Sequence, residues 1–221
     1  QNNVQGACDM GALPNLYPGY QGVADPAVRE KFQKAWKAEL SDKPGKTVTE
    51  LITAAGREIR ALYIMAENPC LSDPDVNHVM ECLQRLDFLV VQDIFLTETA
   101  KFAHLVLPGA CFAEKTGTYT NTERRFQLLH KAVDPPGKAK GDFEILCLMG
   151  KALGLSFDYA TPADVMSEYA NLVPAYAGIC FDRLERAGLQ WPCPDENHPG
   201  TRFLHGERFT RGLGRCGATA R

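Results

Sequence analysis

Closely spaced cysteines, which hold most structural zinc ions and iron–sulfur clusters, are missing from this sequence. Eight cysteines are present, but no two are closer than twelve residues and none forms a C-x-x-C pair. Several stand among apolar neighbours, as Cys82 and Cys147 do, which is typical of small core residues. The even count allows disulfides, but the sequence shows no secretory signal, so we expect reduced thiols in a cytoplasmic protein.

The motifs of several common enzyme classes are also missing. There is no G-x-G-x-x-G of dehydrogenases, no G-x-x-x-x-G-K-[ST] of P-loop NTPases and no H-E-x-x-H of zinc peptidases. The net charge is −3 and the isoelectric point is near 6.0, so no basic field attracts a nucleic-acid backbone. No apolar stretch approaches the roughly 18 residues that a membrane helix needs. We therefore expect no nucleic-acid partner and no membrane span in this segment.

What is present is ordinary for a globular protein. Hydrophobic residues make up 45% and charged residues 23% of the 221 residues, enough for one or two domains with a real core. The chain begins with Gln1 rather than methionine, and its last residues, RGLGRCGATAR, are small and without period. We expect a piece of a longer protein.

Short apolar runs alternate with helical patterns in the middle of the chain. The runs at 60–65, 87–94 and 103–107 predict buried strands, and Asp73, followed by proline, predicts the start of a helix that runs to 85. Strand, helix and strand at this spacing form a βαβ unit, which implies a parallel sheet with a right-handed crossover. The fold class is therefore α/β, with a parallel sheet and flanking helices.

Other elements are expected on either side of this unit. Residues 1–25 predict an extended loop, residues 109–127 a loop-rich stretch, and residues 189–221 show no clear element. The remaining expected elements are a short helix opened by Thr97 or Thr99, a strand at 126–130, and helices at 26–40, 48–58, 143–153 (capped by Asp142), 162–172 and 179–187.

Two polar loops follow adjacent strands of the expected sheet. Residues 66–73 (AENPCLSD) follow the first strand, and residues 92–99 (QDIFLTET) follow the second. Open α/β sheets bind ligands at the carboxyl ends of their strands, where carboxylates accept from guanine N–H groups or ribose hydroxyls. The pattern indicates a nucleotide site. Ordinary turn and cap chemistry at Asn-Pro and Asp-Pro is the other interpretation.

The other reactive side chains favour structural roles. His78 is expected on a helix and His104 beside a strand, each as a structural residue rather than a ligand. The run ERR at 123–125 predicts a solvated or ion-paired segment rather than a phosphate clamp. Cys8 has no His–acid partner pattern that would make it a nucleophile, and QWPCP at 190–194 predicts a packing corner.

Six stretches, in the same order along the chain, carry a resemblance to one enzyme family. They are QNNVQGACDMGALPNLYPGYQ at 1–21, YIMAENP at 63–69, VVQDIFLTETAKFAHLVLPG at 90–109, EKTGTYTNTERRFQ at 114–127, GDFEILCLMGKALG at 141–154 and QWPCP at 190–194. The pattern Q-D-x-F-x-T-x-T-A followed by L-P resembles the molybdopterin oxidoreductase superfamily. QNNVQGACDMG resembles the alpha (catalytic) subunit of formate dehydrogenase within it. The resemblance extends to about Gly214.

The resemblance implies a function for the whole protein. Enzymes of this family oxidise formate to CO2 at a molybdenum or tungsten centre held by two molybdopterin guanine dinucleotides. They pass the electrons through a 4Fe-4S iron–sulfur cluster to electron-transfer subunits. The family's catalytic residues, metal ligand and cluster cysteines lie upstream of the stretch matched here. We therefore expect no catalytic residue and no metal ligand in this chain, and no activity of the chain alone on formate.

The resemblance also implies that this segment binds a guanine dinucleotide. The implied fold is a Rossmann-like parallel sheet with flanking helices, the central part of a molybdopterin oxidoreductase. The positions that match the family's cofactor contacts are Gln1, Ala66, Glu67, Asn68, Ser72, Gln92, Gly109 and Asp142. Three of them depart from the common pattern: Ala66 stands where many relatives have Gly, Asn68 where some have Asp, and Gly109 where some have Ser.

A domain division follows from the same resemblance. Residues 1–111 are expected to form a partial guanine dinucleotide-binding domain, and 112–140 a loop-rich segment returning to the N-terminal cluster domain. Residues 141–188 are expected to continue the α/β domain as helices, and 189–221 to link towards a C-terminal domain.

Two alternatives stay open. One is another subunit of the superfamily, such as a nitrate reductase or the large subunit of complex I. The other is an inactive fragment or a non-enzymatic α/β module.

Overall fold

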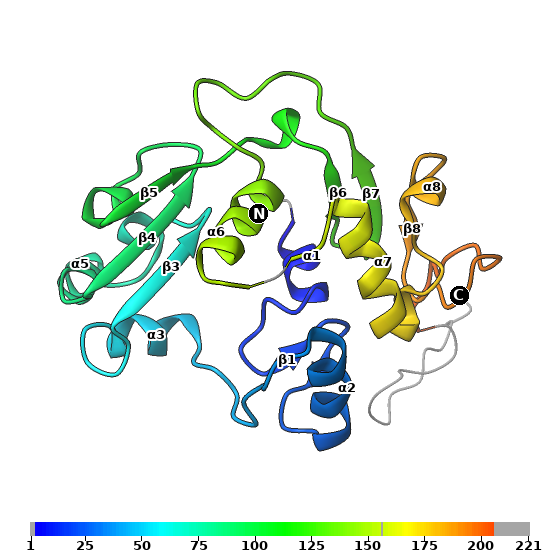
Figure 1. The fold of residues 1–221 in the computed structure, drawn as a ribbon, viewed down its shortest axis with the longest axis horizontal. Coiled ribbons are helices and arrows are strands. Elements are labelled where there is room, and N and C mark those ends of the chain that lie inside the picture. The colour runs from blue at the N-terminus through cyan, green and yellow to red at the C-terminus, as the bar shows by residue number, and fades with distance from the viewer. Residues whose placement is uncertain (1–2, 156, 206–221) are drawn as a thin grey trace, which may run out of the picture. The chain divides into compact units, whose positions relative to one another are not determined.

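The computed structural model describes residues 3–155 and 157–205, and it divides into two compact units (Figure 1). Unit 1 comprises the described residues of 1–42, 118–128 and 163–221, and unit 2 comprises those of 43–117 and 129–162. The domain boundaries expected at residues 111, 140 and 188 stay a prediction.

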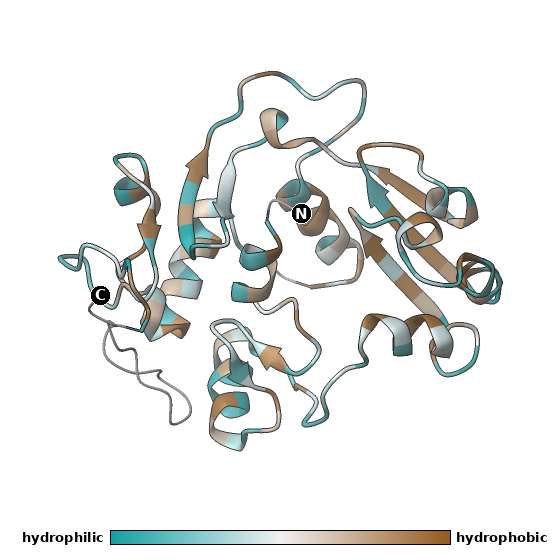
Figure 2. Ribbon diagram, turned by 180° about the vertical axis from the view of Figure 1, so that it is seen from behind, coloured by the Kyte–Doolittle hydropathy of each residue, from teal (hydrophilic) through white to brown (hydrophobic). Residues whose placement is uncertain are grey.

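Unit 2 is built on a three-stranded parallel sheet with the order β3-β4-β5. The strands are β3 (Ala61–Met65), β4 (Phe88–Asp93) and β5 (Leu105–Pro108), so all three expected strands are confirmed. The register places Met65 opposite Gln92 at the carboxyl ends of β3 and β4. Figure 2 shows these strands coloured mostly as hydrophobic, in agreement with the apolar runs that predict them.

Short helices connect and cover these strands. They are α3 (Val48–Ala54), α4 (Pro69–Ser72), α5 (Val76–Gln84), η1 (Thr99–Phe102), η2 (Phe112–Glu114) and α6 (Asp142–Ala152). Thr47 caps α3 in a capping box with Glu50. The predicted start of the next helix at Asp73 is wrong. Pro69–Ser72 already forms α4, and Asp75 is the N-cap of α5 because its side chain accepts from the backbone N–H of His78.

The apolar core of unit 2 lies on one face of the sheet. It combines Ile64 of β3 and Leu89 and Val91 of β4 with Ile52, Cys70, Val79, Cys82, Leu83 and Leu86. Because successive strand residues point to opposite faces, Val90 and Gln92 lie on the other face. His104 is structural, as expected, since its Nδ1 accepts from the backbone N–H of Leu89 at 2.9 Å.

Unit 1 consists of short elements. They are α1 (Val4–Asp9), β1 (Leu16–Tyr17), β2 (Gln21–Gly22), α2 (Pro26–Trp36), β6 (Gly117–Thr120), β7 (Arg125–Leu129), α7 (Pro162–Leu172), η3 (Pro174–Tyr176), α8 (Phe181–Leu184) and β8 (Leu189–Gln190). The strands β6, β7 and β8 form a second three-stranded sheet. β6 begins and β7 ends one residue outside this unit.

Several expectations for unit 1 are wrong in detail. Residues 1–25 are not a continuous loop, because they contain α1 and a two-stranded antiparallel ladder. The loop-rich stretch 109–127 contains β6, and 189–221 begins with β8. The helix expected at 179–187 is only four residues long. The helix expected at 26–40 ends at Trp36, where Lys37 takes a left-handed conformation with φ 50°.

The core of unit 1 confirms the packing corner predicted at QWPCP. Phe126, Tyr176, Ile179 and Cys193 are essentially inaccessible, and the Trp191 ring lies 5.9 Å from that of Tyr176. The bond from Trp191 to Pro192 is cis.

The ERR run at 123–125 is structural as well. Arg125 approaches Glu123 at 3.8 Å, and Arg124 donates to the backbone carbonyls of Trp191 and Thr201. The ion pairing expected within this run is therefore confirmed. The cysteines in the described part of the chain are free thiols, and within that part no helix has the length and apolar character to cross a bilayer.

Candidate functional site

Two loops meet at the carboxyl edge of the unit 2 sheet. Asn68, which directly precedes α4, donates from Nδ2 to Glu98 Oε2 at 2.7 Å. Its Oδ1 accepts from Thr99 Oγ1 at 2.7 Å and from the Thr99 backbone N–H at 3.1 Å. Thr99 is fully buried and its Oγ1 also accepts from the backbone N–H of Cys70. These bonds, which we call the Asn68 clasp, fix the loop after β3 to the loop after β4.

A second set of bonds joins β3 and β4 to the start of α6. The Tyr63 hydroxyl donates to Gln92 Oε1 at 2.5 Å, and Gln92 Nε2 donates to Asp142 Oδ1 at 2.6 Å. Lys115 Nζ donates to Asp142 Oδ2 and, at 2.9 Å, to the backbone carbonyl of Ala110. Gln92 is 1% exposed, whereas the Asp142 side chain is 36% exposed. This Asp142 network therefore runs from the interior to one accessible carboxylate.

The surroundings of Tyr63 favour its neutral phenol. Burial raises the pKa of Tyr63, and the nearby Asp142 charge raises it further, so the phenol stays a hydrogen-bond donor. Asp142 was expected to cap α6, but Gly141 is the N-cap and Asp142 is the first helical residue. A carboxylate in the first turn is still stabilised by the positive end of the helix dipole.

Gly109 lies at the same edge of the sheet, directly after β5. Its backbone N–H donates to the carbonyl of Asp93 at 2.9 Å, and it pairs with Lys140 in an isolated parallel bridge. A Cβ added to Gly109 would meet atoms of Asp93 and Gln92 at 3.7 Å, an ordinary van der Waals distance. A serine therefore fits at this position as well as glycine does.

The end of β3 has a strained backbone. Ala66 takes the left-handed conformation, with φ 57°, and its N–H donates to the carbonyl of Gln92 at 2.9 Å. This conformation favours glycine, which is the residue that many relatives have here according to the resemblance. Glu67 follows as an exposed side chain, and Ser72 donates to the backbone carbonyl of Asn68.

The structure thus places seven of the eight predicted site residues in unit 2, and Gln1 lies outside the described residues. Gln92 and Asp142 are bonded directly, and Ala66 joins Gln92 through its backbone. Asn68 forms the clasp, Ser72 bonds the backbone carbonyl of Asn68, Gly109 adjoins Gln92, and Glu67 is exposed. The assignment of all eight to a cofactor stays a prediction.

Three polar residues of this edge were not predicted. Thr99 is a buried partner of Asn68, Tyr63 is a partly buried partner of Gln92, and Lys115 bridges Asp142 to the segment after β5. Tyr63 carried a weak signal, because it is a polar-tipped residue inside an apolar strand pattern. Lys115 carried none, since 27 residues separate it from its partner.

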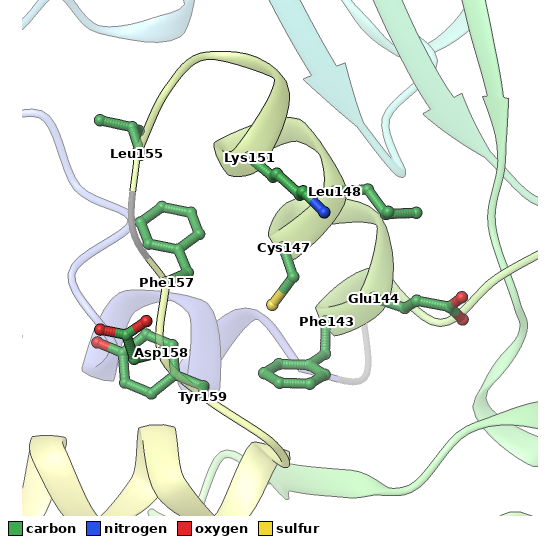
Figure 3. A pocket seen from close by; sticks show the side chains of 9 residues that line it. All are labelled: Phe143, Glu144, Cys147, Leu148, Lys151, Leu155, Phe157, Asp158 and Tyr159. Atoms are coloured by element: carbon green, nitrogen blue, oxygen red, sulfur yellow. The ribbon is translucent and has the colours of Figure 1, made fainter.

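The described residues hold no group of three or more His, Cys, Asp or Glu side chains arranged to bind a metal ion. A hollow of about 400 Å³ lies along α6 and the segment that follows it (Figure 3). The rings of Phe143, Phe157 and Tyr159 and the side chains of Cys147 and Lys151 line it. It includes none of the predicted site residues.

Parallel strands with a partly exposed carboxylate and two joined loops at their carboxyl edge define an α/β protein with a candidate ligand site at that edge. The particular family follows from comparison with known proteins. The sequence model of the molybdopterin oxidoreductase family matches residues 1–152, and the chain belongs to this family.

Similar curated proteins include the F420-dependent formate dehydrogenase subunit alpha of Methanocaldococcus jannaschii, 54% identical over 97% of this chain. The F420-dependent formate dehydrogenase 1 subunit alpha of Methanococcus maripaludis is 49% identical over 94% of the chain. A putative formate dehydrogenase of Staphylococcus haemolyticus is 43% identical over 96%. The chain spans only 32%, 31% and 22% of these relatives, respectively.

Among solved structures, the acetylene hydratase of Pelobacter acetylenicus is similar in fold. It matches 74% of this chain and 24% of its own, with a TM-score of 0.52 and 20% sequence identity. The α/β fold expected from the sequence, with its parallel sheet and flanking helices, is therefore confirmed.

Proposed function

We propose that this chain is part of a formate dehydrogenase, an oxidoreductase, and that its unit 2 binds the guanine dinucleotide of a molybdopterin cofactor. The observation that carries the proposal is the Asp142 network. It presents one accessible carboxylate at the carboxyl edge of a parallel sheet, held by Gln92 and Lys115. The names of the relatives support formate as the substrate of the whole protein.

The residues at this edge fit a nucleotide. A guanine base offers adjacent N–H donors, and a carboxylate is the side chain that accepts two of them. Asp142 supplies that carboxylate, and Gly109 presents no side chain at the same edge. Glu67, exposed after β3, supplies a further acceptor for hydroxyl groups.

Gln92 acts through its neighbours in this proposal, whereas Asn68 keeps one donor for the ligand. Gln92 is 1% exposed and both ends of its amide are bonded, so it orients Asp142 rather than touching the ligand. The Asn68 amide oxygen already accepts two hydrogen bonds, and one N–H of its amide nitrogen donates to Glu98. The second N–H of that nitrogen remains for a ligand. Ala66 and Ser72 shape the loop, and Gln1 is retained as a contact on the resemblance alone.

The cofactor, when bound, supplies two-electron chemistry at a molybdenum or tungsten centre. This chain's own residues bind and orient its nucleotide end, and we place no catalytic residue and no metal ligand among them. The catalytic groups, the 4Fe-4S cluster, the contacts with electron-transfer subunits and the substrate site belong to other parts of the protein in this proposal. A cytoplasmic location also stays a prediction.

Calorimetric titration of the 221-residue chain with guanosine diphosphate tests the nucleotide proposal. We expect binding, weaker by about tenfold or more for adenosine diphosphate, because adenine cannot donate two N–H groups to Asp142. Asp142→Asn is expected to lose the preference. The matched control is Asp134→Asn, which removes an exposed carboxylate that pairs with Lys131. Equal affinity for both nucleotides, or no binding, would contradict the proposal.

A further inference from the structure

A hollow of about 370 Å³ in unit 1 is lined mostly by basic side chains. Its walls come from the β6–β7 turn, the start of β7, β8 and the segment that follows β8: Glu123, Arg124, Arg125, Gln190, Arg202 and Phe203. The arginines outweigh the glutamate by two positive charges, in a chain whose net charge is −3. The hollow is therefore a local positive site on an acidic protein.

Two of these arginines are held in place and still have N–H donors to offer. Arg124 donates to two backbone carbonyls, and Arg125 donates to a third carbonyl and to Gln190 Oε1, both at 3.2 Å. A guanidinium carries five N–H donors, so donors remain on both after these bonds. Guanidinium groups with a fixed orientation and unused donors suit the planar, paired recognition of an oxyanion.

The charge of Arg124 is only partly compensated by the protein. Burial lowers the pKa of Arg124, and the charge of Asp9 opposes that shift. The Trp191 ring, 5.2 Å from the guanidinium carbon, shields one side of the group from water. An anion in the hollow would stabilise this charge in the same way that Asp9 does.

The two residues that complete the hollow have no structural task of this kind. Arg202 is exposed, and within residues 3–155 and 157–205 it pairs with no carboxylate. The Glu123 carboxylate lies 3.8 Å from Arg125 and is 64% exposed, so it screens the arginines weakly. Phe203 is 82% exposed, and an aromatic ring on the wall of a positive hollow offers a face to the organic part of a ligand.

We propose that this hollow binds the phosphate group of a small organic phosphate, with Arg202 as a direct contact of the phosphate and Phe203 as a contact of the organic part. A phosphate monoester carries close to two negative charges at neutral pH, which matches the excess of positive charge here. The run at 123–125 alone favoured ion pairing, and only the fold adds Arg202 to it. The hollow shares no residue with the candidate site of unit 2, so this inference does not depend on the proposed function.

NMR titration of the 221-residue chain with inorganic phosphate, at pH 7.5 and constant ionic strength, tests the site. We expect saturable shifts of the backbone amides of residues 123–125 and 202–203. Arg202→Met is expected to weaken phosphate binding about fivefold or more and to leave the fold intact, because Arg202 holds no other described residue. Arg186→Met removes the same charge from an exposed position outside the hollow, and is expected to change the affinity by less than about twofold.

Two further probes define the class of ligand. Phenyl phosphate is expected to bind about threefold more tightly than inorganic phosphate, and Phe203→Ala to remove that gain. Succinate, whose two charges lie on separate carboxylates, is expected to bind about threefold more weakly than phosphate.

Three outcomes overturn this inference: no saturable shifts at the hollow, phosphate binding to Arg202→Met as tight as to the unaltered chain, or equal affinity for succinate and phosphate. None of them involves Asp142, so each leaves the proposed function standing.

Discussion

Trp191 donates its indole N–H to Asp9 Oδ2 at 2.7 Å, although 182 residues separate the two in the sequence. Asp9 is fully buried in unit 1, and its other oxygen accepts from Gln5 at 2.7 Å and from the hydroxyl of Tyr20 at 2.9 Å. Burial raises the pKa of Asp9, and these three hydrogen bonds and the charge of Arg124 oppose that rise. A buried carboxylate at the end of α1 therefore organises the packing corner around Trp191.

Asp9→Asn is expected to change both the stability of unit 1 and its pH dependence. The folded pKa of Asp9 lies above its unfolded value of 3.8, so the folded state binds the proton more tightly. The contribution of Asp9 to the free energy of unfolding is fully present below pH 3.8 and is lost as the pH rises through the raised pKa. Urea unfolding between pH 3.5 and 7 measures that slope, which the variant is expected to lack.

At neutral pH the same variant is expected to be less stable by about 1–3 kcal/mol. Three hydrogen-bond donors surround Asp9, and the asparagine amide would place its own N–H donors against one or more of them. Asp182→Asn, which alters an exposed aspartate of α8, is the control. An Asp9→Asn variant as stable as the unaltered chain, with an unchanged slope, would show that the carboxylate is not part of the packing.

Arg183→Met is expected to destabilise unit 1 by about 1–3 kcal/mol. The Arg183 guanidinium donates to three backbone carbonyls: Gly178 at 2.5 Å, His198 at 2.6 Å and Asp195 at 3.3 Å. Methionine keeps the stem but leaves these carbonyls without that donor. Chemical unfolding followed by tryptophan fluorescence measures this loss of stability, since Trp191 shortly precedes Asp195 and His198 in the chain.

Lysine at the same position is expected to recover only part of the loss, because one ammonium cannot reproduce the planar fork. Arg186→Met, an exposed neighbour on the same stretch, serves as the control. If Arg186→Met lowers the free energy of unfolding as much as Arg183→Met does, the hydrogen bonds from Arg183 to these carbonyls do not stabilise unit 1.

Thr99→Val is expected to loosen the Asn68 clasp. Thr99 is fully buried, so valine fills the same space but leaves Asn68 Oδ1 and the Cys70 N–H without their hydroxyl partner. We expect a loss of about 1–3 kcal/mol in unfolding free energy and faster amide exchange in the loop after β3.

Thr99→Ser retains the hydroxyl and is expected to keep the slow exchange, at the smaller cost of one buried methyl group. Amide exchange rates of residues 67–72, measured by NMR in both variants, show whether the Thr99 hydroxyl fixes this loop. Equal exchange in the valine and serine variants would mean that the hydroxyl does not fix the loop.

Ala66→Gly is expected to stabilise unit 2 by about 1 kcal/mol. The φ of 57° places the Ala66 Cβ against its own backbone, and glycine carries no such penalty. The control is Ala61→Gly at the start of β3, where glycine is expected to cost about 0.5–1 kcal/mol through chain entropy. Thermal unfolding of the two variants should shift in opposite directions, and a loss of stability in Ala66→Gly would contradict the strained conformation.

Local patterns in the sequence determined much of the fold. Apolar runs of five or six residues predict β3 and β4, because parallel strands covered on both faces need no polar alternation. Asp25 followed by proline starts α2, and Thr47 with Glu50 starts α3, since caps are chemistry between neighbours. Elements without such signals escaped prediction. The six-residue α1 has no side-chain cap, and β8 is two residues long.

The start of α5 shows a different limit. Both Asp73 and Asp75 have the chemistry of a cap, and Pro74 made the first of them the better candidate. The structure selects Asp75, in a left-handed conformation with φ 55°, because Pro69–Ser72 has already turned as α4. A neighbouring element, rather than local propensity, decided the boundary.

The sequence by itself determined the sheet, the two polar loops at its carboxyl edge and the resemblance to the molybdopterin oxidoreductases, since each resides in contiguous residues. Only the tertiary structure decided which side chains complete the site. Gln92 reaches Asp142 across 50 residues, and Lys115 reaches it across 27. Such pairs leave no local periodicity, because the fold of unit 2, and not the spacing along the chain, brings their atoms within bonding distance.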